Sequence, residues 1–141
     1  MPMRFRRMVS GILVAGTLAF VGMEGRLAAQ APSPAKQSVA GGGVTVAVTF
    51  LKERTDAPTF QVVLDTHSAN LDGYRFEEIV RLRDGKGGEG APAAVDDAKG
   101  SGHHREATVR FTWPEPRLQT LELVVKGVAG VPERVFRWGL Q

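Results

Sequence analysis

Large apolar and small or polar residues alternate strictly in several short runs, and turns rich in Gly, Pro and Asp separate these runs. In residues 44–50, every second residue is Val or Phe, and the residues between them are Thr and Ala. Successive side chains of a strand point to opposite faces, so this run predicts a strand with one buried face. The pattern recurs about every dozen residues. The predicted strands are 44–50, 59–65, 74–83, 91–95, 107–113, 118–125 and 132–140.

These short strands, with turns between them and no convincing helix, predict an all-β protein. We expect an immunoglobulin-like antiparallel β-sandwich of about six to eight short strands. A helix over residues 75–82 is the competing interpretation of one segment, but the segment is short and has no cap, so strand is preferred. Residues 84–102 are expected to be the least ordered part of the domain. Both tryptophans, Trp113 and Trp138, alternate with other apolar residues and are expected in the core.

The N-terminal residues have the three parts of an export signal. Arg4, Arg6 and Arg7 precede an apolar run that ends at Met23, and the small-residue segment 27–31 follows. The apolar run is shorter than the ~20 residues that span a bilayer comfortably, so a cleaved signal peptide is preferred to a retained anchor. We therefore predict a signal peptide over 1–29, a flexible leader over 30–43 and a β-sandwich domain over 44–141.

The basic character of the whole chain comes from the predicted signal peptide. The chain has 18 Lys and Arg residues against 15 Asp and Glu residues. Residues 1–29 contain four arginines and Glu24, so the remainder has 14 basic and 14 acidic residues. A neutral domain without a basic run argues against nucleic-acid binding. The chain has no cysteine, which excludes disulfides, lipid attachment to a cysteine and cysteine-based metal sites.

Three histidines are the candidate metal ligands. His67 follows a predicted strand, and His103 and His104 lie between Gly102 and the next strand. Imidazoles from two loops at one end of a sandwich would suit copper or zinc. Neighbouring strand residues point to opposite faces, so His103 and His104 can share a metal only where the backbone is irregular. The alternative is that these imidazoles tether loops or face solvent.

Two arginines are the candidate ligand or partner residues. Arg105 follows the histidine pair, and Arg134 lies in the last predicted strand. Either could instead pair with an acidic side chain and lock a loop. The segment 65–68 contains Asp65, His67 and Ser68, but residues so close together in a strand cannot normally supply the contacts of a catalytic triad. No catalytic residue is predicted.

Three motifs carry a resemblance to a known group of proteins. They are LDTHS at 64–68, GHHR at 102–105 and GVPERVFRW at 130–138. Together they resemble a family of small exported prokaryotic β-sandwich domains. The resemblance runs from about residue 44 to the C-terminus. It implies a compact β domain behind a signal or anchor, and it implies no activity.

Two functions follow as hypotheses from these observations. The first is an exported binding or accessory module without catalytic activity or cofactor, located in the periplasm or outside the cell. Its partner would be another exported or envelope protein. The alternative is a periplasmic copper- or zinc-binding protein that uses His67, His103 and His104. After signal cleavage, neither hypothesis includes a membrane span.

Overall fold

The computed structural model describes residues 33–140. The predicted signal peptide, 1–29, lies outside these residues. Residues 33–140 form nine strands and one short helix. In order these are β1 (Lys36–Gly41), β2 (Val44–Phe50), β3 (Thr59–Thr66), α1 (Phe76–Ile79), β4 (Val80–Arg83), β5 (Glu89–Gly90), β6 (Ala94–Ser101), β7 (His104–Arg110), β8 (Thr120–Val128) and β9 (Val131–Gly139). Within the described part of the chain, no helix is long and apolar enough to cross a membrane.

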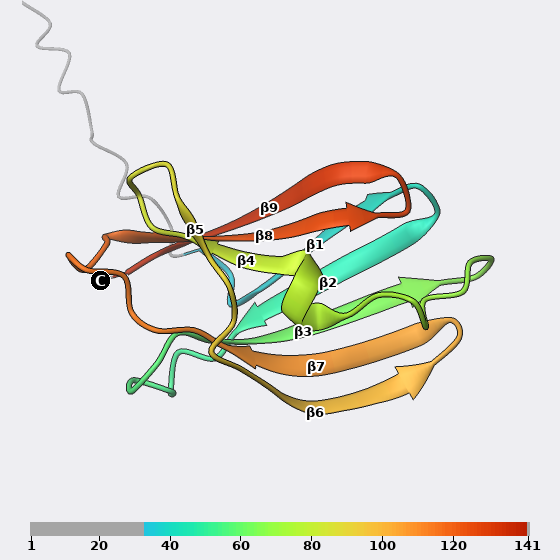
Figure 1. The fold of residues 1–141 in the computed structure, drawn as a ribbon, viewed down its shortest axis with the longest axis horizontal. Helices are drawn as coiled ribbons and strands as arrows, with labels where there is room; N and C mark the ends of the chain where they lie inside the picture. The colour runs from blue at the N-terminus through green and yellow to red at the C-terminus, as the bar shows by residue number, and fades with distance from the viewer. Residues whose placement is uncertain (1–32, 141) are drawn as a thin grey trace, which may run out of the picture. The chain divides into compact units, whose positions relative to one another are not determined.

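The strands form two antiparallel sheets that face each other (Figure 1). One sheet has the order β1-β2-β3-β7-β6, and the other has the order β5-β4-β8-β9. Without β1, these are the orders of strands A-B-E-D and C′-C-F-G in an immunoglobulin-type sandwich. The predicted fold class is therefore confirmed, with β1 as an extra strand on the first sheet.

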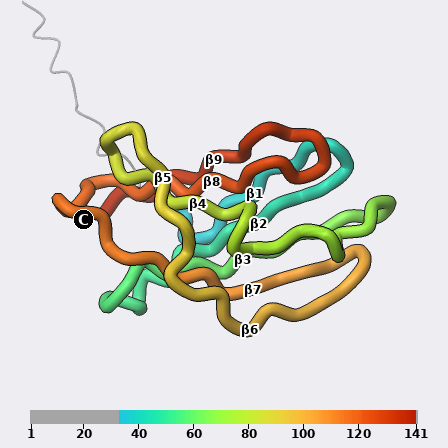
Figure 2. Tube along the Cα trace, viewed as in Figure 1, coloured from blue at the N-terminus to red at the C-terminus, as the bar shows by residue number. Residues whose placement is uncertain are grey.

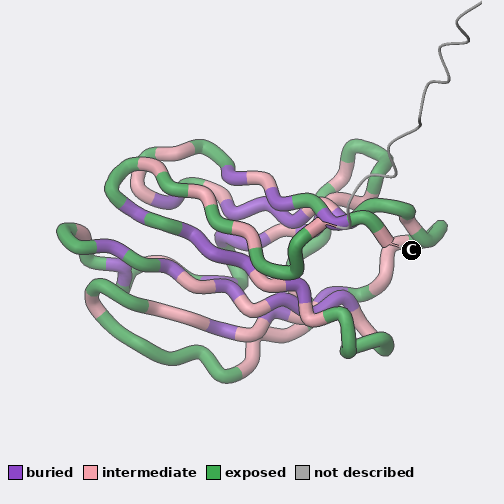
Figure 3. Tube along the Cα trace, turned by 180° about the vertical axis from the view of Figure 1, so that it is seen from behind, coloured by how far each residue is buried: buried purple, intermediate pink, exposed green. Residues whose placement is uncertain are grey.

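The core lies between the sheets and is built by the alternation that the sequence shows. Buried segments recur along the strands, and the turns at the two ends are mostly exposed (Figure 3). An aromatic cluster occupies the core: the ring centroid of Trp138 lies 5.9 Å from that of Phe50, 5.2 Å from that of Phe60 and 6.4 Å from that of Phe136. Trp138 is fully buried, as predicted. Its indole Nε1 donates to the main-chain oxygens of Pro34 and Ala35, which fixes the entry of the chain into β1.

The prediction of a flexible leader over 30–43 is wrong for residues 36–41, which form β1. Its residues pair in register with β2, from Lys36 opposite Thr49 to Gly41 opposite Val44. Only one of them, Val39, is a large apolar residue, so the segment lacks the alternation of a half-buried strand. The Gln37 side chain also contacts the other sheet, because its amide donates to the Arg137 carbonyl over 2.6 Å and accepts from the Arg137 N–H over 3.4 Å. Backbone pairing and this bridge hold β1 in place.

Two other segments also differ from the prediction. The predicted strand 74–83 is a strand only from Val80, because Phe76–Ile79 forms one helical turn that buries Phe76 and Ile79. The segment 84–102, expected to be poorly ordered, contains β5 and the eight-residue strand β6. A bulge between Asp96 and Lys99 bends β6, which explains why its sequence alternates poorly.

The sandwich has two distinct ends (Figure 2). We call one the hairpin end: it contains the turns β1–β2, β6–β7 and β8–β9 together with the loop 67–75. At this end Gly42 has φ +61°, and a Cβ added to it would lie 2.2 Å from the Ala129 carbonyl oxygen. Glycine is therefore required where the β1–β2 turn meets the β8–β9 turn. The opposite end, formed by the loops 51–58, 84–88 and 111–119, is the pocket end.

A network of charged side chains covers the outer face of the second sheet. Arg83 lies 3.0 Å from carboxylate oxygens of both Glu122 and Glu133, and Arg137 lies 2.5 Å from the second carboxylate oxygen of Glu122. Lys126 pairs with Glu89 over 2.6 Å. Hydrogen bonds from Arg137 and Arg83 lower the pKa of Glu122 below its ordinary value of 4.5, and a bond from Lys126 lowers the pKa of Glu89 in the same way.

We expect this network to make the protein less stable in acid. Carboxyl groups with folded-state pKa values below 4.5 contribute stability that is present above pH 4.5 and is lost as the pH falls through those lowered values. The thermal midpoint should therefore drop by several degrees between pH 5 and the acid range below 4. Replacing Glu122 with Gln should make this drop smaller. An unchanged pH dependence in the Glu122→Gln protein would show that the network does not carry the effect.

Candidate functional site

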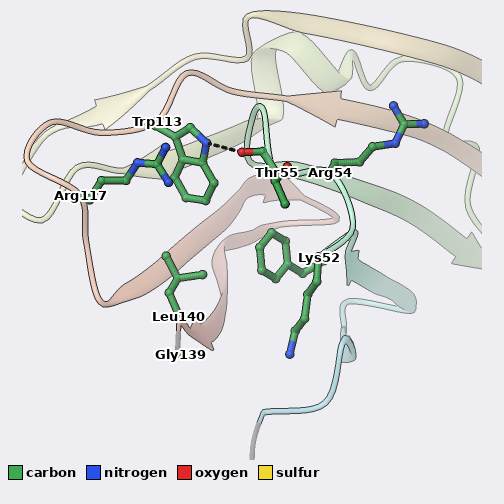
Figure 4. Close-up of a pocket in the computed structure, with 8 residues that line it drawn as sticks. Lys52, Arg54, Thr55, Trp113, Arg117, Gly139 and Leu140 are labelled. Atoms are coloured by element: carbon green, nitrogen blue, oxygen red, sulfur yellow. Dashed lines mark hydrogen bonds between the residues drawn. The ribbon is translucent and has the colours of Figure 1, made fainter.

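An open cavity of about 400 Å³ lies at the pocket end (Figure 4). Its lining comes from the end of β2 and the following loop, from the loop after β7, and from the end of β9. We call this cavity the Trp113 pocket. The residues that line it are Phe50, Lys52, Arg54, Thr55, Trp113, Arg117, Gly139 and Leu140.

Local contacts hold the Trp113 side chain at the wall of this pocket. The indole Nε1 donates to the Thr55 carbonyl oxygen over 3.3 Å. The Arg117 guanidinium lies over the indole ring at 4.1 Å from its centroid, within the range of a cation–π contact. Trp113 is only partly buried, so the prediction that both tryptophans belong to the core holds fully for Trp138 alone. The indole is therefore positioned by the protein and still accessible from the pocket.

Apolar groups complete the inner surface of the pocket. Phe50 ends β2 and is 6% exposed, with its ring stacked on that of Phe60. Leu140 follows β9, and its N–H donates to the Gln119 carbonyl oxygen over 2.7 Å. Both residues are anchored to the main body of the sandwich, so the apolar floor does not depend on a loose loop.

The charged residues that line the pocket are all cations. Residues 33–140 contain 14 Lys and Arg side chains, and ten of them contact an acidic side chain or a main-chain oxygen within the described chain. The four that have neither kind of contact are Lys36, Lys52, Arg54 and Arg117, and the last three line the Trp113 pocket. Among residues 33–140, cations without a contacting acidic side chain are thus concentrated at this cavity.

A second cavity at the same end differs from the Trp113 pocket in that its charged lining residues are paired with one another. Its lining includes Arg83, Glu89 and Glu122, which belong to the charge network of the second sheet. Arg83 is already paired with both of these glutamates. This cavity therefore has no uncompensated charge with which to attract a ligand.

The three histidines lie at the hairpin end, away from the loops that form the Trp113 pocket. His67, His103 and His104 are all exposed. His104 Nδ1 donates to the Asp65 carboxylate over 2.6 Å, across the β3–β7 pair. Among residues 33–140, no group of three or more His, Asp or Glu side chains is placed to hold a metal ion. Copper or zinc binding by these histidines thus stays a prediction without a supporting contact.

The two arginines predicted to meet a ligand or partner are occupied by the main chain instead. Arg105 donates through Nη1 to the carbonyl oxygens of Leu71, Asp72 and Tyr74, and so holds the loop that precedes α1. Arg134 is only 2% exposed. It therefore cannot present its charge to a partner, and that part of the prediction is wrong for Arg134.

Hydrogen bonds of Thr66 hold the segment 65–68, which contains His67 and Ser68, at the end of β3. The Thr66 hydroxyl donates to the Gly43 carbonyl oxygen over 2.7 Å and accepts from the N–H groups of Ser68 and Ala69 over 3.3 Å. The segment therefore ends β3 by satisfying main-chain groups, as polar residues at a strand end commonly do.

Sequence reasoning missed the Trp113 pocket, although some signals for it are present. Lys52 and Arg54 lie in the polar turn before Pro58, and Arg117 follows a tryptophan and two prolines. In an immunoglobulin-type topology, the loops after β2 and after β7 lie at the same end of the sandwich, because β2 and β7 both pair antiparallel with β3. The clue is that Lys52, Arg54 and Arg117 lie on two loops that meet at one end, one of them with a tryptophan, although each loop contains as many acidic as basic residues.

Comparisons with known proteins give no relative on which to rest a function: no family model, no curated protein and no solved structure matches this chain.

Proposed function

We propose that the protein is an exported binding or accessory module without catalytic activity, and that its ligand binds in the Trp113 pocket. The observation that carries this proposal is the pocket itself. An indole ring, a phenyl ring and a leucine side chain line the cavity, and three cations surround them without an acidic partner among the described residues.

The size and chemistry of the cavity support binding of a small group. Ligand sites usually have volumes of roughly 300 to 1,000 Å³ and combine an apolar lining with a few polar groups that fix orientation. The Trp113 pocket is near the lower end of this range. It therefore suits one or two rings, or one large side chain, better than a whole oligomer.

The proposed export of this module rests on the sequence. The cationic start, apolar run and small-residue segment of residues 1–31 have the order of a secretion signal. A ligand or partner would accordingly be met in the periplasm or outside the cell.

A mapping experiment with simple probes tests the binding function. Backbone ¹⁵N–¹H spectra of the full chain would be recorded with millimolar benzoate, benzamide, benzylamine and cyclohexanol. We expect at least one of these probes to shift the amide signals of residues 50–55, 113–118 and 139–140 in a saturable way. No saturable shift in these segments, or saturable shifts only at the hairpin end, would contradict the proposal.

A further inference from the structure

We propose that the ligand of the Trp113 pocket is an apolar group that carries a single carboxylate. This inference rests on the proposed binding function and adds the chemical class of the ligand. It is carried by the position of three cations that contact no carboxylate of the described chain, next to an apolar floor.

The charged side chains that line the cavity are positive. Lys52 and Arg117 are exposed and lie at the margin of the pocket, on loops from opposite sides of it (Figure 4). Neither contacts a carboxylate of the described chain, whereas Arg83, Arg110 and Arg137 each pair with one. An arriving anion would therefore not have to displace a carboxylate of residues 33–140.

A purely ionic ligand such as phosphate would leave the apolar floor of the pocket uncovered. Phe50, Leu140 and the indole of Trp113 offer ring and methyl surfaces, and apolar contact is worth most where the surfaces are already fixed. A ligand that satisfies both parts needs an apolar body for the floor and an anionic group for the margin. The volume of about 400 Å³ limits the apolar body to one or two rings or to one large side chain.

The three cations of the pocket differ in how each can contact a carboxylate. In Figure 4 the Arg117 guanidinium lies against the Trp113 ring, and Arg54 extends away from that ring. The planar guanidinium of Arg117 can donate two N–H groups to one carboxylate, and Lys52 adds a single mobile ammonium. Arg54 therefore adds to the positive electrostatic potential at the pocket but does not contact the ligand.

Affinities for three probes of equal shape test the charge preference. The probes are naphthalene-2-carboxylate, naphthalene-2-carboxamide and 2-naphthylmethylamine. Each is titrated into the full chain, and binding is followed by the amide shifts of the residues that line the pocket. Because exposed ionic contacts each change affinity by only a few-fold, we expect the carboxylate to bind roughly five- to tenfold more tightly than the amide, and the amine to bind most weakly. Added salt should reduce the preference for the carboxylate.

Substitutions separate the charge effect from damage to the pocket. Lys52→Gln and Arg117→Gln should each lower the ratio of carboxylate to amide affinity a few-fold, and Arg117→Lys should retain part of that ratio. Lys86→Gln is the matched control, because Lys86 is a cation at the same end that does not line this pocket. It should leave all three affinities unchanged.

The possible outcomes distinguish this inference from the proposed function. Equal binding of all three probes in the pocket, or tightest binding of the amine, would overturn the carboxylate class and leave the binding function in place. Binding of none of these probes, nor of those in the mapping experiment, would overturn both. A second pair, a short peptide with a free C-terminal phenylalanine carboxylate and its C-terminal amide, identifies the source of the acid. Tighter binding of the peptide acid than of the naphthoate indicates a protein C-terminus, and the reverse order indicates a free organic acid.

Discussion

Replacing Trp138 with alanine should lower the free energy of unfolding by about 4 kcal/mol, as expected for deletion of a large aromatic side chain from a packed core. Trp138 is fully buried and contacts aromatic rings from both sheets. Its Nε1 also donates to two main-chain oxygens of the segment that leads into β1. Domains of this size are stable by only about 5 to 15 kcal/mol, so a loss of 4 is a large part of the total.

Chemical denaturation of the two proteins measures this loss. Trp138→Phe is the matched variant, because it keeps an aromatic ring in the core and removes the two indole hydrogen bonds. It should be less damaging than the alanine substitution. A loss below about 1 kcal/mol for Trp138→Ala would mean that the site collapses around the missing ring, and that Trp138 does not tie the two sheets together.

Replacing Arg134 with methionine should destabilise the protein by about 2 kcal/mol. The Arg134 side chain donates to the Val128 carbonyl oxygen over 2.9 Å and to the Gly41 carbonyl oxygen over 2.5 Å, so it connects the β8–β9 turn to the β1–β2 turn. Methionine fills much of the same volume and leaves both acceptors without their donor. Removal of the buried guanidinium offsets part of this cost. Burial lowers the pKa of Arg134, so the charged form of this side chain is disfavoured in the folded protein.

Arg137 provides the control for this substitution. It lies three residues further along the same strand, and its side chain is 62% exposed in an ion pair with Glu122. Arg137→Met should therefore cost no more than about 1 kcal/mol. Equal stabilities for the wild-type and Arg134→Met proteins, measured in the same denaturant series, would refute the role of Arg134 as a brace between the sheets.

The parts of the fold that follow from the sequence are those in which one face of a strand is buried. Val44–Phe50 and the strand that contains Phe136 and Trp138 alternate as expected and pair as an immunoglobulin-type sandwich requires. β1 could not be predicted in this way. It is held by pairing with β2 and by the Gln37 bridge, and neither contact leaves a hydrophobic pattern.

The buried role of Arg134 was also hidden in the sequence. Strand alternation places Arg134 on the same face as Phe136 and Trp138, but an arginine is almost never fully buried unless its polar atoms find partners. Only the meeting of two turns from different sheets places main-chain oxygens around it and buries it. Arg105 is a similar case, because its acceptors lie about 30 residues earlier in the chain, in the loop before α1.

The candidate site was missed for a related reason. The histidines attract attention because they are few, and two of them are adjacent, yet the structure leaves all three exposed at the hairpin end. The Trp113 pocket is assembled from segments around residues 50, 115 and 140. Which cations remain without an acidic partner depends on side-chain pairing across strands, and sequence spacing does not reveal that pairing.

Intermolecular nuclear Overhauser effects between naphthalene-2-carboxylate and the full chain would test the central claim most directly. We expect contacts from the naphthalene protons to the Trp113 indole, the Phe50 ring and the Leu140 methyl groups, which line one pocket. Contacts to the loop 67–75 and the β6–β7 turn, with none to these three side chains, would contradict it.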